Sequence, residues 1–402
     1  MKSLIILKGL AKTEKLKWVH DEKIENYYLD GDVVRKLYST PELIKPTIDV
    51  LSRSQSSLVY SRFIEILLLR LCRGNLVVVD LAQESTSGVE LLATIFGYRV
   101  FYKIFPIPQD YLTEPKKYNL PCYQSKKRSE VEKDIKQFLN LQLSGKEVIN
   151  SYKDVVKFWK DYGVLELEDY ERVLHLSDLH SNYSSLSNID LQTPDFCVFH
   201  GDYIDGLEQG GSKKLIKKII SDKSGKYIFL EGNHEIRLRK YLGWLSLRST
   251  NNRTTISNQL YQTIPEDFLS TTAHEFEDFS STDAWKWLLE LNNKLLTHAI
   301  LKRGNFTYIC THAGIRYLEQ LTPKHVGSLI YGSRDMDSYD REFSRRYKGK
   351  NIVSIHAHCK YPSGWNPVKY EGVINLDPED ESEIVYVENN NKNKFELCLE
   401  RL

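Results

Sequence analysis

The stretch FCVFHGDYID, residues 196–205, decides the fold of the larger part of this chain. Its first residues are mainly apolar, and a glycine and two carboxylates, Asp202 and Asp205, follow at once. A short apolar run bounded by polar residues is typical of a buried strand in an α/β sheet. Ligands and reacting groups in such sheets gather beyond the carboxyl ends of the strands. The stretch therefore predicts a strand that delivers two carboxylates to one edge of a sheet.

Four further segments, on both sides of this stretch, end in the same way. They are VLHLSDLH (173–180), YIFLEGNHE (227–235), YICTHAG (308–314) and IVSIHAH (352–358). The metal-ligating side chains that they would deliver are Asp178, His180, Asn233, His312, His356 and His358. Carboxylates, imidazoles and amides at strand ends suit a pair of borderline divalent ions. We expect Mn²⁺, with Ni²⁺, Fe²⁺ and Zn²⁺ as alternatives.

The spacing of these residues suggests how they share two ions. Alternate residues leaving a strand can point the same way, so Asp178 and His180 can reach one metal. Asp202 is the natural bridge between the ions. Two such ions bind phosphoryl oxygens, acidify a shared water and offset the charge of in-line displacement. We expect His234 to protonate the leaving oxygen and Asp205 to orient the His234 ring.

Residues 173–376 resemble the calcineurin-like metallophosphoesterase superfamily. The pattern of that family is D-x-H, G-D-x-x-D, G-N-H-E/D, a single later histidine and G-H-x-H. The resemblance implies a four-layer α/β/β/α domain, which we place at residues 168–402. It also implies that metal one is held by Asp178, His180 and Asp202 and metal two by Asp202, Asn233, His312 and His356, with His234 as proton donor.

The chain departs from the pattern of the family or of one of its branches at Ile355 and Gly206, and the role of His358 is open. Ile355 replaces the glycine of the last motif. His358 is either a further ligand of metal one or, as in the branch related to phosphoprotein phosphatases, no ligand. That branch has a phosphate-gripping arginine directly after G-D-x-x-D, where this chain has Gly206. We expect either that Arg237 or Arg316 takes its place or that the substrate phosphate is held more weakly.

The first 160 residues predict a separate α/β domain. Strand-like runs at 3–7, 75–80 and 98–105 alternate with helical stretches, which favours a parallel sheet. The lysine-rich stretch 116–161 has helical patterns and no strand signal, so we interpret it as a lid with connecting helices. After the first strand, Gly9 and Lys15 match two positions of the phosphate-binding P-loop, G-x-x-x-x-G-K-[ST]. Glu14 replaces the second glycine and Leu16 removes the magnesium-binding hydroxyl.

The order of segments in this half resembles the adenylate-kinase-like kinase domain of bacterial polynucleotide kinase-phosphatases. That resemblance implies a 5′-hydroxyl acceptor site with Asp32 and Arg35, a strand-end acidic position at Asp80 and a lid arginine at Arg128. The same enzymes place a calcineurin-like phosphatase directly after the kinase. We expect this degenerate P-loop domain to have lost ATP-dependent transfer while keeping contact with a nucleic-acid end, and the sequence leaves ATP binding open. In the alternative interpretation, Asp32 and Arg35 are a solvated pair at a helix start.

Composition limits the choice of partners and location. The 55 basic residues almost cancel the 54 acidic residues, so net charge gives no argument for nucleic acid or membrane. Basic, tyrosine-containing stretches at 116–136 and 341–350 are compatible with a phosphate backbone. No apolar run is long enough to span a membrane, and six scattered cysteines fit reduced thiols, so we expect a cytoplasmic protein.

These observations lead to one expected function and two alternatives. We expect a phosphatase for 2′,3′-cyclic phosphate or 3′-phosphate ends, of RNA rather than DNA, acting beside a separate RNA ligase. The first alternative is a protein serine/threonine phosphatase or dinucleoside polyphosphate hydrolase. The second is a regulatory protein that binds nucleic-acid ends and in which both domains have decayed.

Overall fold

The computed structural model describes most of the chain and divides it into two compact units. The described residues are 1–9, 12–31, 33–34, 53–81, 86–105, 146–170, 172–184, 195–206, 208–248, 254–333, 335–358, 368–377, 385–388 and 398–401. The N-terminal unit comprises Ser3–Ala93 and Tyr98–Lys157. The C-terminal unit comprises Phe158–Leu402 together with Met1–Lys2 and Thr94–Gly97. Each unit is described by itself.

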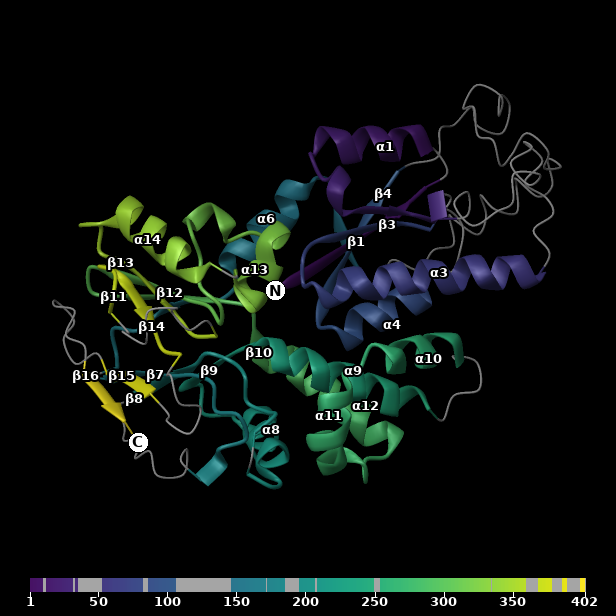
Figure 1. Cartoon of the computed structure of the whole chain (residues 1–402). Coiled ribbons are helices and arrows are strands. Elements are labelled where there is room, and N and C mark those ends of the chain that lie inside the picture. The colour runs from purple at the N-terminus through teal and green to yellow at the C-terminus, as the bar shows by residue number, and fades with distance from the viewer. Residues whose placement is uncertain are drawn as a thin grey trace. The chain divides into compact units, whose positions relative to one another are not determined.

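The N-terminal unit contains a five-stranded sheet with the order β2-β3-β1-β4-β5. Its pairs β1–β3, β2–β3 and β4–β5 are parallel. Strands β1 and β3 are buried along their whole length, as expected of central strands covered on both faces. In Figure 1, α1 lies on one side of this sheet and α3 on the other. The elements are β1 (Lys2–Lys8), α1 (Lys12–Asp21), η1 (Glu25–Tyr27), β2 (Tyr28–Asp30), α3 (Arg53–Cys72), β3 (Val77–Asp80), α4 (Ser87–Ile95), β4 (Tyr98–Ile104), β5 (Glu147–Ile149) and α6 (Tyr152–Asp161).

The parallel sheet expected for this half is present, and the expectation for residues 116–161 is wrong at one point. Glu147–Ile149 forms the edge strand β5, which pairs with residues 101–103 of β4. Three residues are too few to show an alternating apolar pattern, so no strand was predicted there. Helix α6 agrees with the expected helical pattern. The expected lid region, 116–145, lies outside the described residues.

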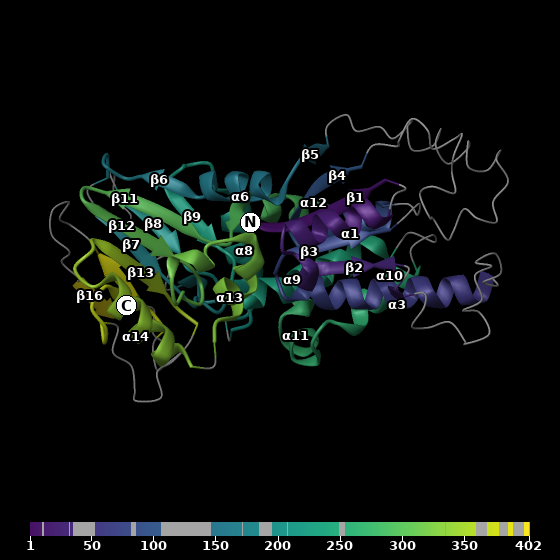
Figure 2. The same ribbon diagram turned by 90° about the horizontal axis from the view of Figure 1, so that it is seen from above.

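The C-terminal unit contains two sheets. One has six strands in the order β10-β9-β8-β7-β15-β16, and the other has five in the order β14-β13-β12-β11-β6. The pairs β7–β8, β8–β9 and β9–β10 are parallel, as are β12–β13, β13–β14 and β6–β11. The pairs β7–β15, β15–β16 and β11–β12 are antiparallel. Figure 2 shows β11, β12 and β13 side by side. The strands are β6 (Val164–Glu166), β7 (Arg172–Leu176), β8 (Asp195–Phe199), β9 (Tyr227–Leu230), β10 (Leu295–Leu296), β11 (Ala299–Arg303), β12 (Phe306–Cys310), β13 (Ile352–His356), β14 (Val373–Asn375), β15 (Val385–Glu388) and β16 (Cys398–Arg401).

The two sheets share one apolar core. Alternate residues of β8, Phe196 and Val198, pack in the same cluster as Tyr308 of β12 and Val353 of β13. Residues of opposite parity, such as Cys197, face the other side, because successive side chains of a strand point to opposite faces. The arrangement is therefore a sheet-on-sheet sandwich.

Helices complete the layers of the C-terminal unit. In Figure 1, α8 lies outside the six-stranded sheet and α14 outside the five-stranded sheet, which gives the expected α/β/β/α order. The helical elements are α8 (Gly211–Ser221), α9 (Asn233–Leu247), α10 (Thr254–Gln262), α11 (Glu266–Thr271), η6 (Ala273–Phe276), α12 (Ser281–Lys294), η7 (Leu318–Gln320), η8 (Pro323–His325), α13 (Val326–Tyr331) and α14 (Met336–Tyr347). None of the helices in the described residues is both long enough and apolar enough to cross a membrane.

Candidate metal centre

Five strand ends bring metal-ligating side chains together at one edge of the sandwich. Ligand atoms of Asp178, His180 and Asp202 lie within 4.8 Å of one another. A second group with the same spacing contains Asp202, His312 and His358. Asp202 belongs to both groups, which is the arrangement expected of a carboxylate that bridges two ions.

The distances from Asp202 to the neighbouring histidine nitrogens are close to those between ligands of one metal ion. Its Oδ2 lies 3.4 Å from Nε2 of His312 and 4.0 Å from Nδ1 of His358. In the other group, Oδ1 of Asp178 lies 3.9 Å from Nε2 of His180. Two atoms that each lie about 2.1 Å from a common ion are separated by about 3.0–3.4 Å, so small movements would complete such a site.

Asn233 lies beside the second group. It is the first residue of α9, and its Oδ1 is 3.1 Å from Nε2 of His312. An amide oxygen at this place can join the ligands of the second ion. The structure thus brings together six of the seven side chains that the sequence suggested as metal ligands.

Hydrogen bonds to the backbone hold two of the histidines in the orientation that a ligand needs. Nδ1 of His180 donates to the carbonyl of Ile204 at 3.1 Å, and Nδ1 of His312 donates to the carbonyl of His200 at 2.6 Å. Each bond fixes the tautomer in which Nε2 keeps its lone pair. Both Nε2 atoms face carboxylates, so both are available to a cation.

The electrostatics of the carboxylates fit cations at this place. The Oδ2 atom of Asp178 is buried and accepts no hydrogen bond. Burial and the charge of Asp202 together raise the pKa of Asp178 to about 6, against the opposing effect of His312. An unpaired buried carboxylate oxygen is costly unless a cation neutralises it. The donor set and this orphaned oxygen therefore fit two divalent ions, which when bound supply Lewis-acid activation of phosphate and water.

Backbone strain is concentrated at the same residues. Seven non-glycine residues of the described chain have a positive φ, and five of them are Asp178, His180, Asp202, Asp205 and His358. The left-handed region is costly for residues with a Cβ and persists where the surrounding structure enforces it. Strain gathered at proposed ligands is an independent sign of a functional site.

Comparison with known proteins gives the family. The profile of the calcineurin-like phosphoesterases matches residues 171–392, more than half of the chain. The chain belongs to the calcineurin-like phosphoesterase family. It is therefore a member of a family of metal-dependent phosphoesterases, in agreement with the geometry of the site.

Solved structures similar to this chain include two phosphoesterase-type proteins. One is a candidate diadenosine tetraphosphatase, 16% identical, with 60% of this chain and 97% of that chain covered and a TM-score of 0.35. Another is a metallophosphoesterase from Sphaerobacter thermophilus, 14% identical, with 58% and 88% covered and a TM-score of 0.32. No curated protein matches the chain.

The last histidine motif of this calcineurin-like phosphoesterase differs from our expectation. We expected His356 to hold metal two, but its Nε2 lies 3.0 Å from Oδ1 of Asp340, and its Nδ1 bonds the carbonyl of Ala357. Both His356 and Asp340 are fully buried. His358, two residues later, instead faces Asp202 and His312. His356 and His358 are two residues apart, so the sequence alone does not show which of them is the metal ligand. The residue that distinguishes them, Asp340, lies on a different element, α14.

His234 is positioned for proton transfer. Its Nδ1 lies 2.7 Å from Oδ2 of Asp205, and its Nε2 lies 3.7 Å from Oδ2 of Asp202. Burial lowers the pKa of His234, but the bond to Asp205 and the charges of Asp202 and Asp205 outweigh burial and raise it. The hydroxyl of Thr272 donates to the other oxygen of Asp205. The structure therefore joins His234 to Asp205, as the sequence suggested.

Glu235, for which the sequence patterns predicted no role, organises the backbone of the site. Its carboxylate accepts the N–H groups of Asp202 at 3.0 Å, Tyr203 at 2.8 Å and Gly232 at 2.8 Å. The residue is fully buried, and burial raises its pKa to about 7. A glutamate at the third position of a helix that accepts the N–H of the residue before the helix forms one half of a capping box, and Gly232 has no side chain to form the other half.

Close packing explains why the family arginine is missing after G-D-x-x-D. A Cβ at Gly206 would lie 1.4 Å from the carbonyl oxygen of His180. Any side chain there would displace the loop that carries His180. Two other glycines are similarly enclosed, because a Cβ at Gly232 would lie 2.1 Å from Oδ1 of Asp202 and one at Gly201 would lie 2.9 Å from Nδ1 of His312.

The two arginines considered as replacements have different surroundings. Nη1 of Arg237 donates to Asp205 at 3.2 Å and to Asp267 at 2.9 Å, which places it beside the partner of His234. Arg316 packs over the ring of Tyr339 at 5.7 Å, and its Nε is buried without an acceptor. Arg237 is therefore the one that the structure connects to the site.

The proposed nucleotide-site residues of the N-terminal unit are only partly described. Nζ of Lys15 lies 2.8 Å from Oδ1 of Asp80, and the two side chains are 2% and 4% exposed. Gly9 has a φ of +146°, and a Cβ there would lie 2.8 Å from Cβ of Phe105, so packing alone requires this glycine. Asp32, Arg35 and Arg128 lie outside the described residues.

Proposed function

We propose that this calcineurin-like phosphoesterase removes 2′,3′-cyclic phosphate or 3′-phosphate groups from RNA ends with the help of two divalent ions, Mn²⁺ first, in the cytoplasm. The observation that carries the phosphatase part is the position of Asp202 in two ligand groups at once. In two-ion phosphoryl-transfer sites, a single carboxylate commonly lies between the ligands of the two ions and binds both. The residues for the first ion are Asp178, His180 and Asp202, and those for the second are Asp202, Asn233, His312 and His358.

The residues around the ions have separate tasks in this proposal. His234 donates a proton from Nε2 to the leaving oxygen, since its Nδ1 is held by Asp205. Asp205 keeps the ring in place and favours the imidazolium form. Arg237 contacts the same carboxylate and is the first candidate to hold a non-bridging phosphate oxygen.

The arrangement of the N-terminal sheet supports a nucleic-acid end as substrate. Strands β1 and β3 are neighbours in the sheet. The connection after β1 leads to β2 on one side of this pair, and the connection after β3 leads to β4 on the other side. Ligands of open α/β sheets bind at such switch points. Lys15, which follows β1, and Asp80, which ends β3, form their ion pair there. Together with the resemblance to polynucleotide kinase-phosphatases, this position favours RNA-end repair beside a separate ligase.

The basic stretch 341–350 gives less support to RNA than its composition suggested. Its arginines are paired with acidic neighbours: Arg341 with Asp337, Arg345 with Glu342 and Arg346 with Glu319. Exposed pairs of this kind leave little net positive charge for a phosphate backbone.

A substrate panel with Mn²⁺ tests the proposed function. It compares a 2′,3′-cyclic nucleotide, a 3′-phosphorylated RNA, a phosphopeptide and a dinucleoside tetraphosphate. We expect the first two to be hydrolysed fastest, and Asp178→Ala to abolish turnover of both without unfolding the chain. Preference for the phosphopeptide or the tetraphosphate would replace the RNA-end assignment by a protein phosphatase or a dinucleoside polyphosphate hydrolase. No turnover of any substrate by metal-loaded protein would favour a regulatory protein that binds ends.

The same proposal assigns no phosphotransfer to the N-terminal unit. Lys15 is committed to a buried ion pair, Glu14 brings a negative charge and Leu16, 43% exposed, lacks the hydroxyl for magnesium. Transfer of radiolabel from ATP to a 5′-hydroxyl oligonucleotide is therefore expected to be absent. Robust labelling that disappears in Lys15→Ala would refute this part.

A further inference from the structure

A second group of possible ligands lies in the core, one layer below the metal centre. It consists of His175 near the end of β7, His200 just after β8 and Cys310 at the end of β12. By the alternation of strand residues, these three point inward like Val173 and Val198 of the shared core. Their exposed fractions are 2%, 0% and 0%. Two imidazoles and a thiol thus occupy positions where a sandwich core normally has apolar side chains.

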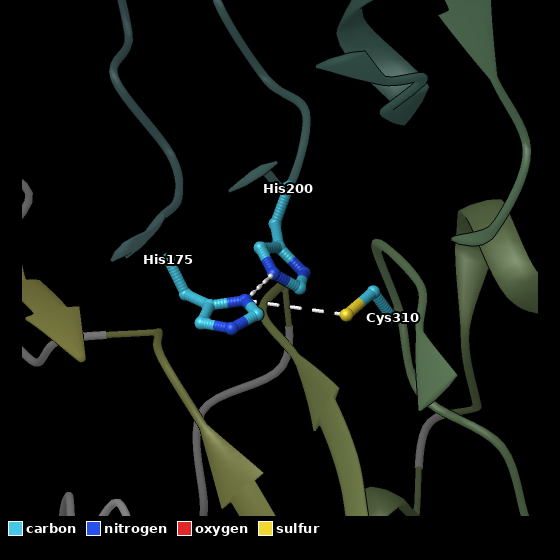
Figure 3. Close-up of side chains that lie close together, drawn as sticks. All are labelled: His175, His200 and Cys310. Carbon is cyan, nitrogen blue, oxygen red and sulfur yellow. Dashed lines mark hydrogen bonds between the residues drawn. The ribbon is translucent and has the colours of Figure 1, made fainter. Parts of the chain in front are cut away.

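The three side chains converge on one point, as Figure 3 shows. Nδ1 of His175 lies 3.1 Å from Nε2 of His200 and 4.0 Å from Sγ of Cys310. All three ligand atoms lie within 4.8 Å of one another. The group draws on both sheets, since β7 and β8 belong to one and β12 to the other.

Hydrogen bonding orients His200 toward the other two residues. Nδ1 of His200 donates to the carbonyl of Thr311 at 3.0 Å, so its Nε2 keeps a lone pair that points to the other two residues. Within the described residues, no acidic side chain belongs to this group, so the histidines are not held there by an ion pair. Burying polar groups in a core is costly unless they find partners, and a bound ion is a stronger partner than one imidazole for another.

We propose that His175, His200 and Cys310 form a third metal site, for a borderline or soft ion of the Zn²⁺ type. Two nitrogens and one sulfur are the donors that such ions prefer, whereas the centre around Asp202 offers oxygen and nitrogen only. In a tetrahedral zinc site, Zn–N of about 2.05 Å and Zn–S of about 2.3 Å place nitrogen atoms about 3.3 Å apart and nitrogen about 3.6 Å from sulfur. The separations of 3.1 Å and 4.0 Å differ from these by only a few tenths of an ångström.

Binding of the ion requires one proton to leave. The thiol of Cys310 gives up its proton to solvent as Sγ bonds the metal. The Nδ1 proton of His175, now donated to His200, moves to Nε2 of the same ring, and His200 keeps its tautomer. The ion then ties the two sheets together from inside the core, and a further ligand such as water fills the fourth position of a tetrahedral ion held by three side chains. This inference does not depend on the proposed substrate.

Cobalt substitution tests the site without any measurement of activity. The full chain is produced in medium supplemented with Co²⁺, because the three side chains are too buried for ready exchange in folded protein. We expect a thiolate-to-cobalt charge-transfer band in the near ultraviolet and three metal equivalents by mass spectrometry. Cys310→Ser should remove the band and lower the count by one. Cys197→Ser, a matched change of another fully buried cysteine on β8, should keep both.

Two outcomes overturn the proposal. One is wild-type protein that binds two equivalents of cobalt and has no charge-transfer band, in which case the three residues form a hydrogen-bonded layer only. The other is a band that survives Cys310→Ser and so arises from another cysteine. If Cys310→Ser fails to fold, the wild-type spectrum and metal count still decide, and His175→Gln is the second variant, with the same expected loss of one equivalent.

Discussion

Nδ1 of His234 lies 2.7 Å from Oδ2 of Asp205, while its Nε2 faces Asp202 at 3.7 Å. The ring is thus held at one nitrogen and directed toward the proposed metal centre with the other. This orientation is what a general acid needs, and it leads to the first prediction.

His234→Ala should lower kcat for an alkyl phosphate or RNA-end substrate by about 10²–10⁴-fold, because the leaving alkoxide loses its proton donor. The loss should be much smaller for p-nitrophenyl phosphate, whose leaving group needs no proton. Steady-state kinetics with both substrates measure the difference, and metal content should stay at the wild-type level. An equal loss with both substrates would mean that His234 supports the site in another way.

His358→Ala and His356→Ala should differ in metal content. His358 faces Asp202 and His312, so its removal should lower the bound metal by about one equivalent. His356→Ala should keep the metal but lower the free energy of unfolding by about 3–5 kcal/mol, because it breaks the buried pair between His356 and Asp340. Metal analysis after gel filtration and thermal unfolding separate the two effects. Loss of metal in His356→Ala with none in His358→Ala would restore the ligand set expected from sequence.

Gly206→Ala should damage the centre although it adds a single methyl group. The new Cβ would fall 1.4 Å from the carbonyl oxygen of His180, so the loop with this ligand must move. We expect weaker metal binding and loss of activity. Gly225→Ala is the control, since a Cβ there would meet open space, so the methyl group adds backbone strain at a φ of +69° but displaces no neighbour. Wild-type metal affinity in Gly206→Ala would show that this loop can adjust at little cost.

Glu235→Gln should loosen the backbone under the metal centre. An amide nitrogen would replace one of the two oxygens that accept N–H groups from Asp202, Tyr203 and Gly232. We expect a loss of about 1–3 kcal/mol of stability for the unsatisfied donor. Metal affinity should fall by about 10–100-fold, as for other residues that orient ligands. Chemical denaturation and metal titration measure the two changes, with Glu266→Gln on the exposed first turn of α11 as the control.

Sequence reasoning was most successful where a strand ended in a polar motif. Asp178, Asp202 and His312 each follow a short apolar run, and local alternation was enough to place them at a common edge. It was insufficient where the choice depended on residues distant in the chain. His356 and His358 differ only through Asp340 on α14, which no local pattern could connect to β13.

Steric requirements were also invisible in the sequence. Gly206 looked like the loss of an arginine, whereas the structure shows that the His180 carbonyl leaves no room for a side chain. Gly9 looked like a remnant of a phosphate loop, and its contact with Phe105 gives it a packing role. At both positions a segment distant in the sequence, at His180 or at Phe105, lies too close to leave room for a side chain.

The ligands of the metal centre come from both sheets of the sandwich: Asp178 and Asp202 follow strands of one, and His312 and His358 follow strands of the other. Ions bound there would link the two sheets at the edge where their strands end. Anything that binds only the native state adds to its stability. A cell short of such ions would then hold a phosphoesterase that is both idle and easier for proteases to cut, so metal supply would govern the lifetime of the protein as well as its turnover.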